Sequence, residues 1–274
     1  GHFLEVRVVA WGRGRPQMRV LITNDDGIAS PGLQALVTEF APVAQTFVVA
    51  PEGERSATGH AITLHKPLRA RVAAIAGATA AWVSNGTPAD CVALGMLELV
   101  PERPDVVLSG INAGPNLARD LTYSGTVSGA MEGAIFGVPS IAVSVAAFTG
   151  PTFPAAAHFS GELVRAILLH GLPPDTLLNV NVPNLPAPRI AGVAITRQSA
   201  RRYISRLDKR VDPRGGVYYW LTGDPSAQED IEGTDTWALA SNQISVTPIT
   251  LDMTDDRAFA VLRSWNLTWS PEKR

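Results

Sequence analysis

The chain alternates between short apolar runs and amphipathic segments over its first two thirds, a pattern typical of strands alternating with helices in an α/β sheet. Runs rich in Val, Ile and Leu that end at polar or proline-containing turns predict buried strands. Segments opened by Ser or Thr and then Pro, with apolar residues three and four positions apart, predict helices. The predicted strands cover residues 19–23, 46–50, 82–84, 104–109, 139–145, 176–182 and 244–247. The predicted helices cover residues 31–40, a segment beginning at Thr87 and Pro88, and residues 124–136, 154–170 and 254–265, while residues 61–72 form either a hairpin or an extended flap.

The first predicted strand ends in Asn-Asp-Asp-Gly at residues 24–27, and a helix follows. Ligands of open α/β sheets bind outside the carboxyl ends of the strands, where this loop lies. The adjacent carboxylates of Asp25 and Asp26 repel each other there and are costly to remove from water, and a divalent cation relieves both penalties. The alternative is a structural turn, because Asn, Asp and Gly are common turn residues.

Two further polar loops follow predicted strands, at residues 51–60 and 110–116. Because the carboxyl ends of parallel strands lie at one edge of a sheet, we expect all three loops to meet there. Their side chains offer hard oxygen donors, which suit Mg²⁺ or Mn²⁺ better than zinc. The candidate donors are Asp25, Asp26, Ser56, Thr58, Asn112 and Asn116.

A fourth loop, made of Ser124, Gly125 and Thr126, precedes a predicted helix and offers a site for an anion. Free backbone N–H groups and the helix dipole favour a phosphate at such a position, and glycine permits a close approach. Metal and phosphate would then be held by separate loops. The alternative is that the hydroxyls only cap the helix. His60, in the second polar loop, either orients water or phosphate or forms a structural hydrogen bond.

The charge and composition of the chain argue against nucleic acid and membranes as partners. The 274 residues carry a formal net charge of −2, which provides no basic field for a nucleic-acid backbone. No apolar run is long enough to span a bilayer, so we expect no membrane partner. The single cysteine, Cys91, excludes an intrachain disulfide and fits a reducing compartment, which predicts a cytoplasmic protein.

The chain is expected to divide into an N-terminal extension at residues 1–17, an α/β core at 18–183 and a C-terminal part at 184–274 that forms one structural domain with the core. Proline spacing and several arginines mark the last part as more exposed. Residues 217–221 read Val-Tyr-Tyr-Trp-Leu, which predicts one arm of a hairpin. An exposed aromatic strand invites aggregation unless it is covered, so a partner subunit is expected.

These motifs, in this order, resemble those of the SurE (survival protein E) family of metal-dependent phosphatases, the 5′/3′-nucleotidases. The match extends from the Asn-Asp-Asp-Gly loop into the C-terminal part, which makes it highly specific. The matching segments are residues 21–28, 30–33, 50–51, 56–63, 86–92, 109–112, 124–127, 179–183, 234–235 and 245–248.

The resemblance implies a Rossmann-like core, a mostly parallel sheet flanked by helices. It also implies a homo-oligomer, a dimer or tetramer, in which a C-terminal hairpin and helix are exchanged between subunits. One divalent metal ion per subunit, Mg²⁺ or Mn²⁺, would be bound by Asp25, Asp26, Ser56 and Asn112.

We therefore expect a metal-dependent phosphomonoesterase acting on nucleoside 5′-monophosphates. Nothing in the sequence ranks 5′ against 3′ phosphates, or short polyphosphate against nucleotides. The metal would polarise the phosphoryl group and position water, and Asp25 or Asp26 would accept a proton. The alternative is a non-catalytic, metal-dependent sensor that binds nucleotides or anions through the same loops. The phosphate or substrate would contact Asn116, Ser124, Gly125, Thr126 and His60.

Overall fold

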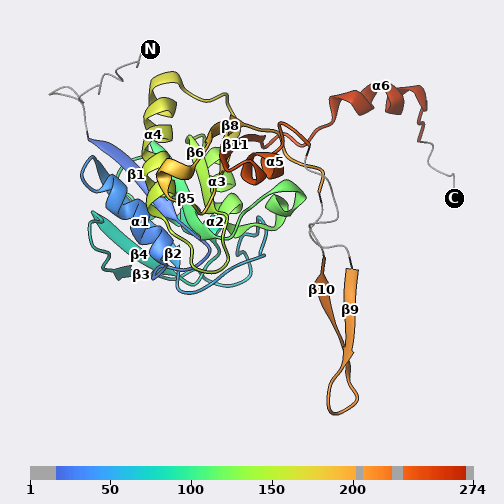
Figure 1. Cartoon of the computed structure of the whole chain (residues 1–274), viewed down its shortest axis with the longest axis horizontal. Helices are drawn as coiled ribbons and strands as arrows, with labels where there is room; N and C mark the ends of the chain where they lie inside the picture. The colour runs from blue at the N-terminus through green and yellow to red at the C-terminus, as the bar shows by residue number, and fades with distance from the viewer. Residues whose placement is uncertain (1–16, 202–205, 224–230, 270–274) are drawn as a thin grey trace.

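The computed structural model describes residues 17–201, 206–223 and 231–269, and a nine-stranded sheet forms its centre (Figure 1). The strand order is β3-β4-β2-β1-β5-β6-β7-β11-β8. The six consecutive strands from β4 to β7 are parallel, whereas β3 and β11 run antiparallel to their neighbours β4 and β7. The strands are β1 (Met18–Thr23), β2 (Ala44–Pro51), β3 (Ala70–Ala73), β4 (Ala80–Ser84), β5 (Val106–Ala113), β6 (Ser140–Val145), β7 (Thr176–Val182), β8 (Gly192–Ile195) and β11 (Gln243–Thr250).

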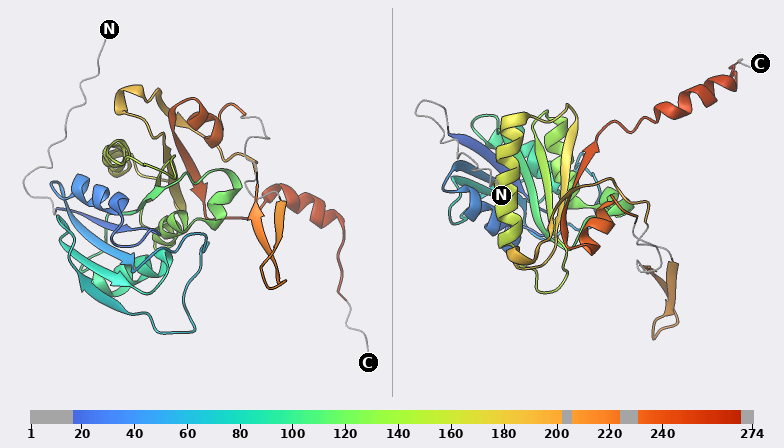
Figure 2. Two further views of the ribbon diagram at one scale, coloured as in Figure 1. Left: turned by 60° about the horizontal axis from the view of Figure 1, so that its bottom comes forward. Right: turned by 45° about the horizontal axis from the view of Figure 1, so that its top comes forward.

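Helices cover both faces of this sheet, as the two views in Figure 2 show. α1 and α4 pack on one face, and α2 and α3 pack on the other. Ser30 caps α1 and Thr87 caps α2, each followed by Pro at the first helical position, as the sequence predicts. The helices are α1 (Pro31–Phe40), α2 (Pro88–Leu94), α3 (Gly125–Ile135), α4 (Pro154–His170), α5 (Asp235–Ala240) and α6 (Asp256–Ser264), with a π-helical turn η1 (Gly95–Leu99) and 3₁₀ turns η2 (Ala118–Tyr123) and η3 (Ala187–Arg189).

The strand order reverses direction next to β1. The chain first adds β2 and β4 on one side of β1, and then adds β5, β6 and β7 on the other. The helices that follow β1 and β5, α1 and α3, therefore lie on opposite faces of the sheet. Open α/β sheets bind ligands at the carboxyl edge of such a switch point.

The predicted alternation of strands and helices is confirmed, but β5 is longer than expected. Residues 110–113 belong to the strand rather than to a loop, with a shift in its pairing to β6 between Ser109 and Asn112. Gly110 makes this course possible, because it passes so close to β6 that a Cβ would lie 2.4 Å from the Val143 carbonyl oxygen.

Two further segments differ in detail. Residues 61–69 form no regular element, whereas the strand β3 that follows pairs antiparallel with β4. The predicted segment at 61–72 therefore contains an irregular stretch and one arm of a hairpin whose other arm is β4. The C-terminal helix begins after Asp255 instead of Thr254, because the Asp255 side chain accepts the Arg257 amide. The strand β8 and the helix α5 had no clear signal in the apolar pattern.

The expected hairpin arm is confirmed. β9 (Arg206–Val211) and β10 (Val217–Thr222) pair antiparallel, and this hairpin extends away from the body, as α6 does in a different direction (Figures 1 and 2). Trp220 in β10 is 60% exposed, and α6 buries none of its residues. The expected N-terminal extension lies outside the described residues except for Gln17. Within the described residues, no helix is both long and apolar enough to cross a membrane.

Two glycines bring α3 unusually close to the sheet. A Cβ on Gly129 would lie 2.7 Å from the Ser109 hydroxyl, and one on Gly133 would lie 2.3 Å from the Ser140 hydroxyl and 2.8 Å from Val107. The helix backbone therefore rests directly on β5 and β6, and its position is set by this contact.

Gly133→Ala should destabilise the fold, because the added methyl group has no space between α3 and the sheet. Overpacking of this kind costs about 1–3 kcal/mol. Urea denaturation at one fixed protein concentration measures the loss. Ile135→Ala, on the exposed side of the same helix, is the control and should change stability by less than about 0.5 kcal/mol. Equal stability of Gly133→Ala and wild type would contradict the close packing.

Candidate active site

A hydrogen bond between its first and last residues, Asn24 and Gly27, closes the loop after β1. The Asn24 side-chain amide donates to the Gly27 carbonyl at 2.9 Å. Gly27 has a φ of +95° and lies so close to Gly53 that a Cβ would be 3.0 Å from the Gly53 Cα. The loop thus presents Asp25 and Asp26 at its turn and contacts the loop that follows β2.

Asp25 lies against the first turn of α3. Its Oδ1 accepts the Thr126 hydroxyl at 2.5 Å, and only 4% of the residue is exposed. A Cβ on Gly125 would lie 2.7 Å from the Asp25 Cβ. The amino end of α3 therefore faces this carboxylate, which a helix dipole stabilises.

Both carboxyl groups prefer the protonated form more than usual. Burial raises the pKa of Asp25, and hydrogen bonds from the Thr126 hydroxyl and from nearby amides oppose that shift. Burial and the Asp25 charge raise the pKa of Asp26 from 3.8 to about 6, opposed by the Ala113 amide. Glu54 adds to the negative field at both groups. A bound cation would offset these costs.

The loop that carries Ser56 is attached to the Asp25 loop by backbone hydrogen bonds. The Arg55 amide donates to the Asp25 carbonyl at 2.7 Å, and the Ile28 amide donates to the Pro51 carbonyl at 2.9 Å. Ser56 is the next residue after Arg55, and its hydroxyl donates to Glu54 at 2.9 Å. The expected convergence of the first two polar loops is therefore present.

The end of β5 contacts the Asp26 carboxylate. The Ala113 amide hydrogen-bonds to Asp26, and Asn112 immediately precedes it. The Asn112 side-chain nitrogen donates to the Gly114 carbonyl at 2.8 Å, so the side-chain oxygen is the atom that can face a cation. Asn112 therefore lies in a strand rather than in a loop, next to a residue that contacts Asp26, and its role as a ligand remains a prediction.

Asn116 is held by the adjacent strands. The Asn181 side-chain oxygen accepts the Asn116 backbone N–H at 2.8 Å, and the Asn181 side-chain nitrogen donates to the Asn116 carbonyl at 2.9 Å. The backbone of Asn116 is therefore fixed on both sides. The Asn116 side chain donates to the Ser144 hydroxyl at 2.8 Å, and Asn179 also donates to its carbonyl. These polar residues of β6 and β7 fix the turn that leads from β5 to η2.

The hydroxyls of the expected anion loop already have partners within the chain. Ser124 caps α3 by accepting the Val127 amide at 3.1 Å, and Thr126 donates to Asp25. The Asp25 loop and the expected anion loop are thus in direct contact at one edge of the sheet. A direct role for Ser124, Gly125 and Thr126 in binding phosphate remains a prediction.

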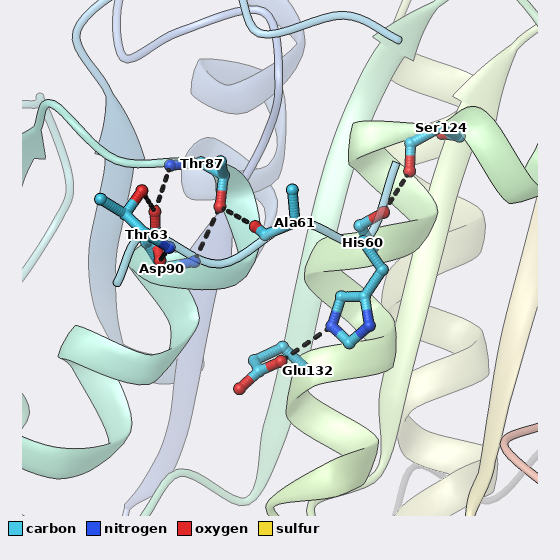
Figure 3. A network of polar contacts seen from close by, with 8 residues as sticks. His60, Ala61, Thr63, Thr87, Asp90, Ser124 and Glu132 are labelled. Atoms are coloured by element: carbon cyan, nitrogen blue, oxygen red, sulfur yellow. Dashed lines mark hydrogen bonds and ion pairs between the residues drawn. The ribbon is translucent and has the colours of Figure 1, made fainter. Parts of the chain in front are cut away.

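His60 makes a contact that favours the structural alternative. Its Nε2 lies 2.8 Å from Oε2 of Glu132 on α3 (Figure 3). The exposed Thr58 hydroxyl also has a local partner, because it donates to the Arg55 carbonyl at 3.0 Å. The partners of these two side chains are Glu132 and the Arg55 carbonyl, and not the Asp25 carboxylate.

The donors brought together fit a hard divalent cation. They are carboxylate, hydroxyl and amide oxygens, and the side-chain oxygen of Asn24 is buried nearby without a hydrogen-bond partner. In the part of the chain that the structure describes, no cluster of three or more His, Cys, Asp or Glu side chains is arranged to hold a metal. A site here would accordingly use two carboxylates, Asp25 and Asp26, completed by neutral oxygens, and would keep coordination positions open for a substrate.

Sequence reasoning assigned no role to three further acidic residues, Glu54, Glu132 and Asp235. Glu54 contributes charge, Glu132 binds His60, and Asp235 on α5 accepts the Ala118 amide at 2.7 Å and the Ser199 amide at 2.9 Å. Burial raises the pKa of Asp235, and these amides oppose the shift. Asp235 lay in a matching motif, but Glu132 is an ordinary helix residue with no signal in the sequence.

Known proteins are similar to this chain over most of its length. The family model described as "Survival protein SurE" matches residues 20–205. A protein of Heliobacterium modesticaldum named 5′-nucleotidase SurE is 51% identical over 249 residues, covering 90% of this chain and 92% of that protein. The protein of the same name from Geobacter sulfurreducens is 49% identical over 252 residues, covering 92% and 95%.

A solved structure matches the fold as well. The crystal structure of the SurE protein from Aquifex aeolicus has a TM-score of 0.81 and 42% sequence identity, covering 91% of this chain and 100% of that one. Since both the family model and these relatives cover most of its length, the chain belongs to the SurE family.

Proposed function

We propose that this chain is a metal-dependent phosphomonoesterase that hydrolyses nucleoside 5′-monophosphates, with Mg²⁺ or Mn²⁺ as its cofactor. The observation that carries the proposal is the adjacent pair of the buried Asp25 and the half-buried Asp26 at the switch point of the sheet, both with raised pKa values. The names of the relatives, 5′-nucleotidase SurE, support the substrate class.

Asp25, Asp26, Ser56 and Asn112 are the proposed metal-binding residues. The bound ion would polarise the phosphoryl group and lower the pKa of a water molecule. Asp25 is fixed by Thr126 and orients the site, whereas the less buried Asp26 is the better candidate to accept a proton. Asn116, Ser124 and Gly125 flank the site on the side of β5 and α3 and are the proposed phosphate-binding residues.

The alternative of a non-catalytic sensor is not favoured, because the relatives are named 5′-nucleotidase SurE. It would bind nucleotide and metal through the same residues without turnover. Phosphate release from a panel of 5′- and 3′-nucleotides and short polyphosphate, each with Mg²⁺, Mn²⁺ or chelator, separates the two. Metal-dependent binding without released phosphate would favour the sensor. Release that is unchanged by chelator would overturn the metal-dependent mechanism.

Asp26→Asn should abolish most of the phosphate release while leaving the fold intact, because it removes one of two charges that bind the cation. Asp25→Asn should have the same effect on turnover. Steady-state phosphate release, metal titration by calorimetry and circular dichroism on the same preparations measure the three properties. Wild-type turnover in either variant would contradict the assignment.

The raised pKa of Asp26 should make the stability of the metal-free protein depend on pH. Because this pKa is about 6 in the folded chain and 3.8 ordinarily, the folded state binds this proton more tightly than the unfolded state. The Asp26 contribution to stability is therefore present below about pH 4 and is lost as the pH rises toward 6. In chelator, wild type should lose stability relative to Asp26→Asn over this interval, and a constant difference would contradict the shift.

Thr126→Ala should weaken both metal affinity and turnover, because its hydroxyl binds the Asp25 carboxylate. A hydrogen bond to a charged group contributes about 1.5–3 kcal/mol, which corresponds to roughly a ten- to hundredfold loss in Mn²⁺ affinity and kcat/KM. Thr126→Ser keeps the hydroxyl and is the matched control. Loss of turnover with unchanged metal affinity would instead assign Thr126 to the phosphate.

We also propose that β9, β10 and α6 mediate homo-oligomerisation. Their exposed apolar side chains include Tyr219 and Trp220 in the hairpin and Trp265 after α6, and such surfaces are covered in stable proteins. Deleting residues 214–222 should therefore shift the protein to smaller species before it alters the sheet. Sedimentation velocity with circular dichroism measures this, and a wild-type monomer at micromolar concentration would contradict it.

A further inference from the structure

The segment between β2 and β3 is fixed by polar contacts rather than by a hydrophobic core. Residues 61–69 form no regular element, and Ile62 and Leu64 are 52% and 84% exposed. The same segment begins with the loop that carries Ser56. Its position must therefore depend on the few hydrogen bonds that hold it to the body of the protein.

One attachment lies at the start of α2 (Figure 3). Thr63 donates through its amide and its hydroxyl to the two Asp90 carboxylate oxygens, at 2.8 and 2.6 Å. The Thr87 hydroxyl donates to the Ala61 carbonyl at 2.7 Å. Because Thr87 and Asp90 also form the capping box of α2, the helix end and the segment are held by the same groups.

The second attachment is the contact between His60 in this segment and Glu132 on α3. Its Nε2 lies 2.8 Å from Oε2 of Glu132, whose side chain is only 11% exposed. The adjacent Gly59 amide donates to the Tyr123 carbonyl at 3.0 Å. His60 follows Ser56 by four residues, so this attachment lies close to the proposed ligand.

Both proposed metal-binding loops are thus tied to one helix. Thr126 in the first turn of α3 binds Asp25, and Glu132 binds His60. Glu132 is six positions beyond Thr126, which is about 9 Å along the helix axis. Because Gly129 and Gly133 seat α3 directly on the sheet, the distance between these two attachments is rigid.

We propose that His60 is a positioning residue: through Glu132 it sets the place of Ser56 relative to Asp25 and Asp26. The inference rests on the proposed function, because it takes Ser56 to be a metal ligand. His60 acts on the loop and not on the substrate, since its Nε2 is directed at a nearly buried carboxylate on α3. Groups that orient a metal ligand in this way contribute to metal affinity even though they do not touch the ion.

The test compares His60→Ala, Glu132→Ala and the double variant. Each single variant should weaken Mn²⁺ affinity about tenfold, as the loss of a group supporting a ligand does. Saturating Mn²⁺ should restore most of kcat with KM for nucleotide unchanged. The double variant should be no worse than either single one, because both remove the same contact. Hydrogen exchange of residues 52–63 should become faster in all three.

Matched controls separate this role from a general loss of stability. His60→Gln can still donate to Glu132 and should retain Mn²⁺ affinity, and Glu132→Gln keeps the volume if Glu132→Ala fails to fold. His158→Ala removes a histidine 3.8 Å from Glu39 on the opposite face of the sheet, and it should change neither affinity nor exchange. Rescue by glutamine with an inert His158→Ala supports positioning.

Several results would overturn the inference. Additive losses in the double variant would mean that the two residues act independently. A raised KM for nucleotide with wild-type Mn²⁺ affinity would place His60 on the substrate. If wild type binds Mn²⁺ and releases phosphate while His60→Ala does both equally well, only this inference fails. If wild type neither binds Mn²⁺ nor releases phosphate, the proposed function fails, and unchanged exchange in residues 52–63 would refute the attachment itself.

Discussion

Removing a carboxylate from water costs several kcal/mol unless it is paired or hydrogen-bonded, and β1 delivers two in succession to a buried edge of the sheet. The surrounding structure meets this constraint with dipoles rather than with cationic side chains. The Thr126 hydroxyl and the first turn of α3 face Asp25, and the Ala113 amide faces Asp26. These groups offset only part of the cost, because both pKa values remain raised. The remaining negative potential is what makes the pair suited to a divalent cation.

The fold could be predicted where local signals decide it. Ser30 and Thr87, each followed by Pro, mark the helix starts because capping involves only residues three positions apart. β-Branched runs likewise mark the buried parallel strands. The approximate convergence of the Asp25, Ser56 and Asn112 segments followed from topology alone, since the carboxyl ends of parallel strands share one edge.

The remaining features depend on contacts between distant residues, which no local pattern encodes. Thr126 and Asp25 are 101 residues apart, and His60 and Glu132 are 72 apart. The sequence shows only that Thr126 has a hydroxyl near a helix start. It does not show whether that hydroxyl binds a phosphate or the Asp25 carboxylate. The extension of β5 through Asn112 depends similarly on how closely Gly110 passes the neighbouring strand.

The contact between α3 and the sheet explains why the two sets of loops cannot be independent. A helix separated from the sheet by large side chains could adjust its height by changes of rotamer, but the bare faces of Gly129 and Gly133 leave no such layer. The helix that binds the Asp25 carboxylate through Thr126 therefore also binds His60 through Glu132, and a shift of the helix would move both contacts. Catalytic geometry must be held to within about half an ångström, and a rigid helix achieves this better than an exposed loop can. The irregular segment carrying Ser56 can thus remain exposed to substrate while its position is set by α3.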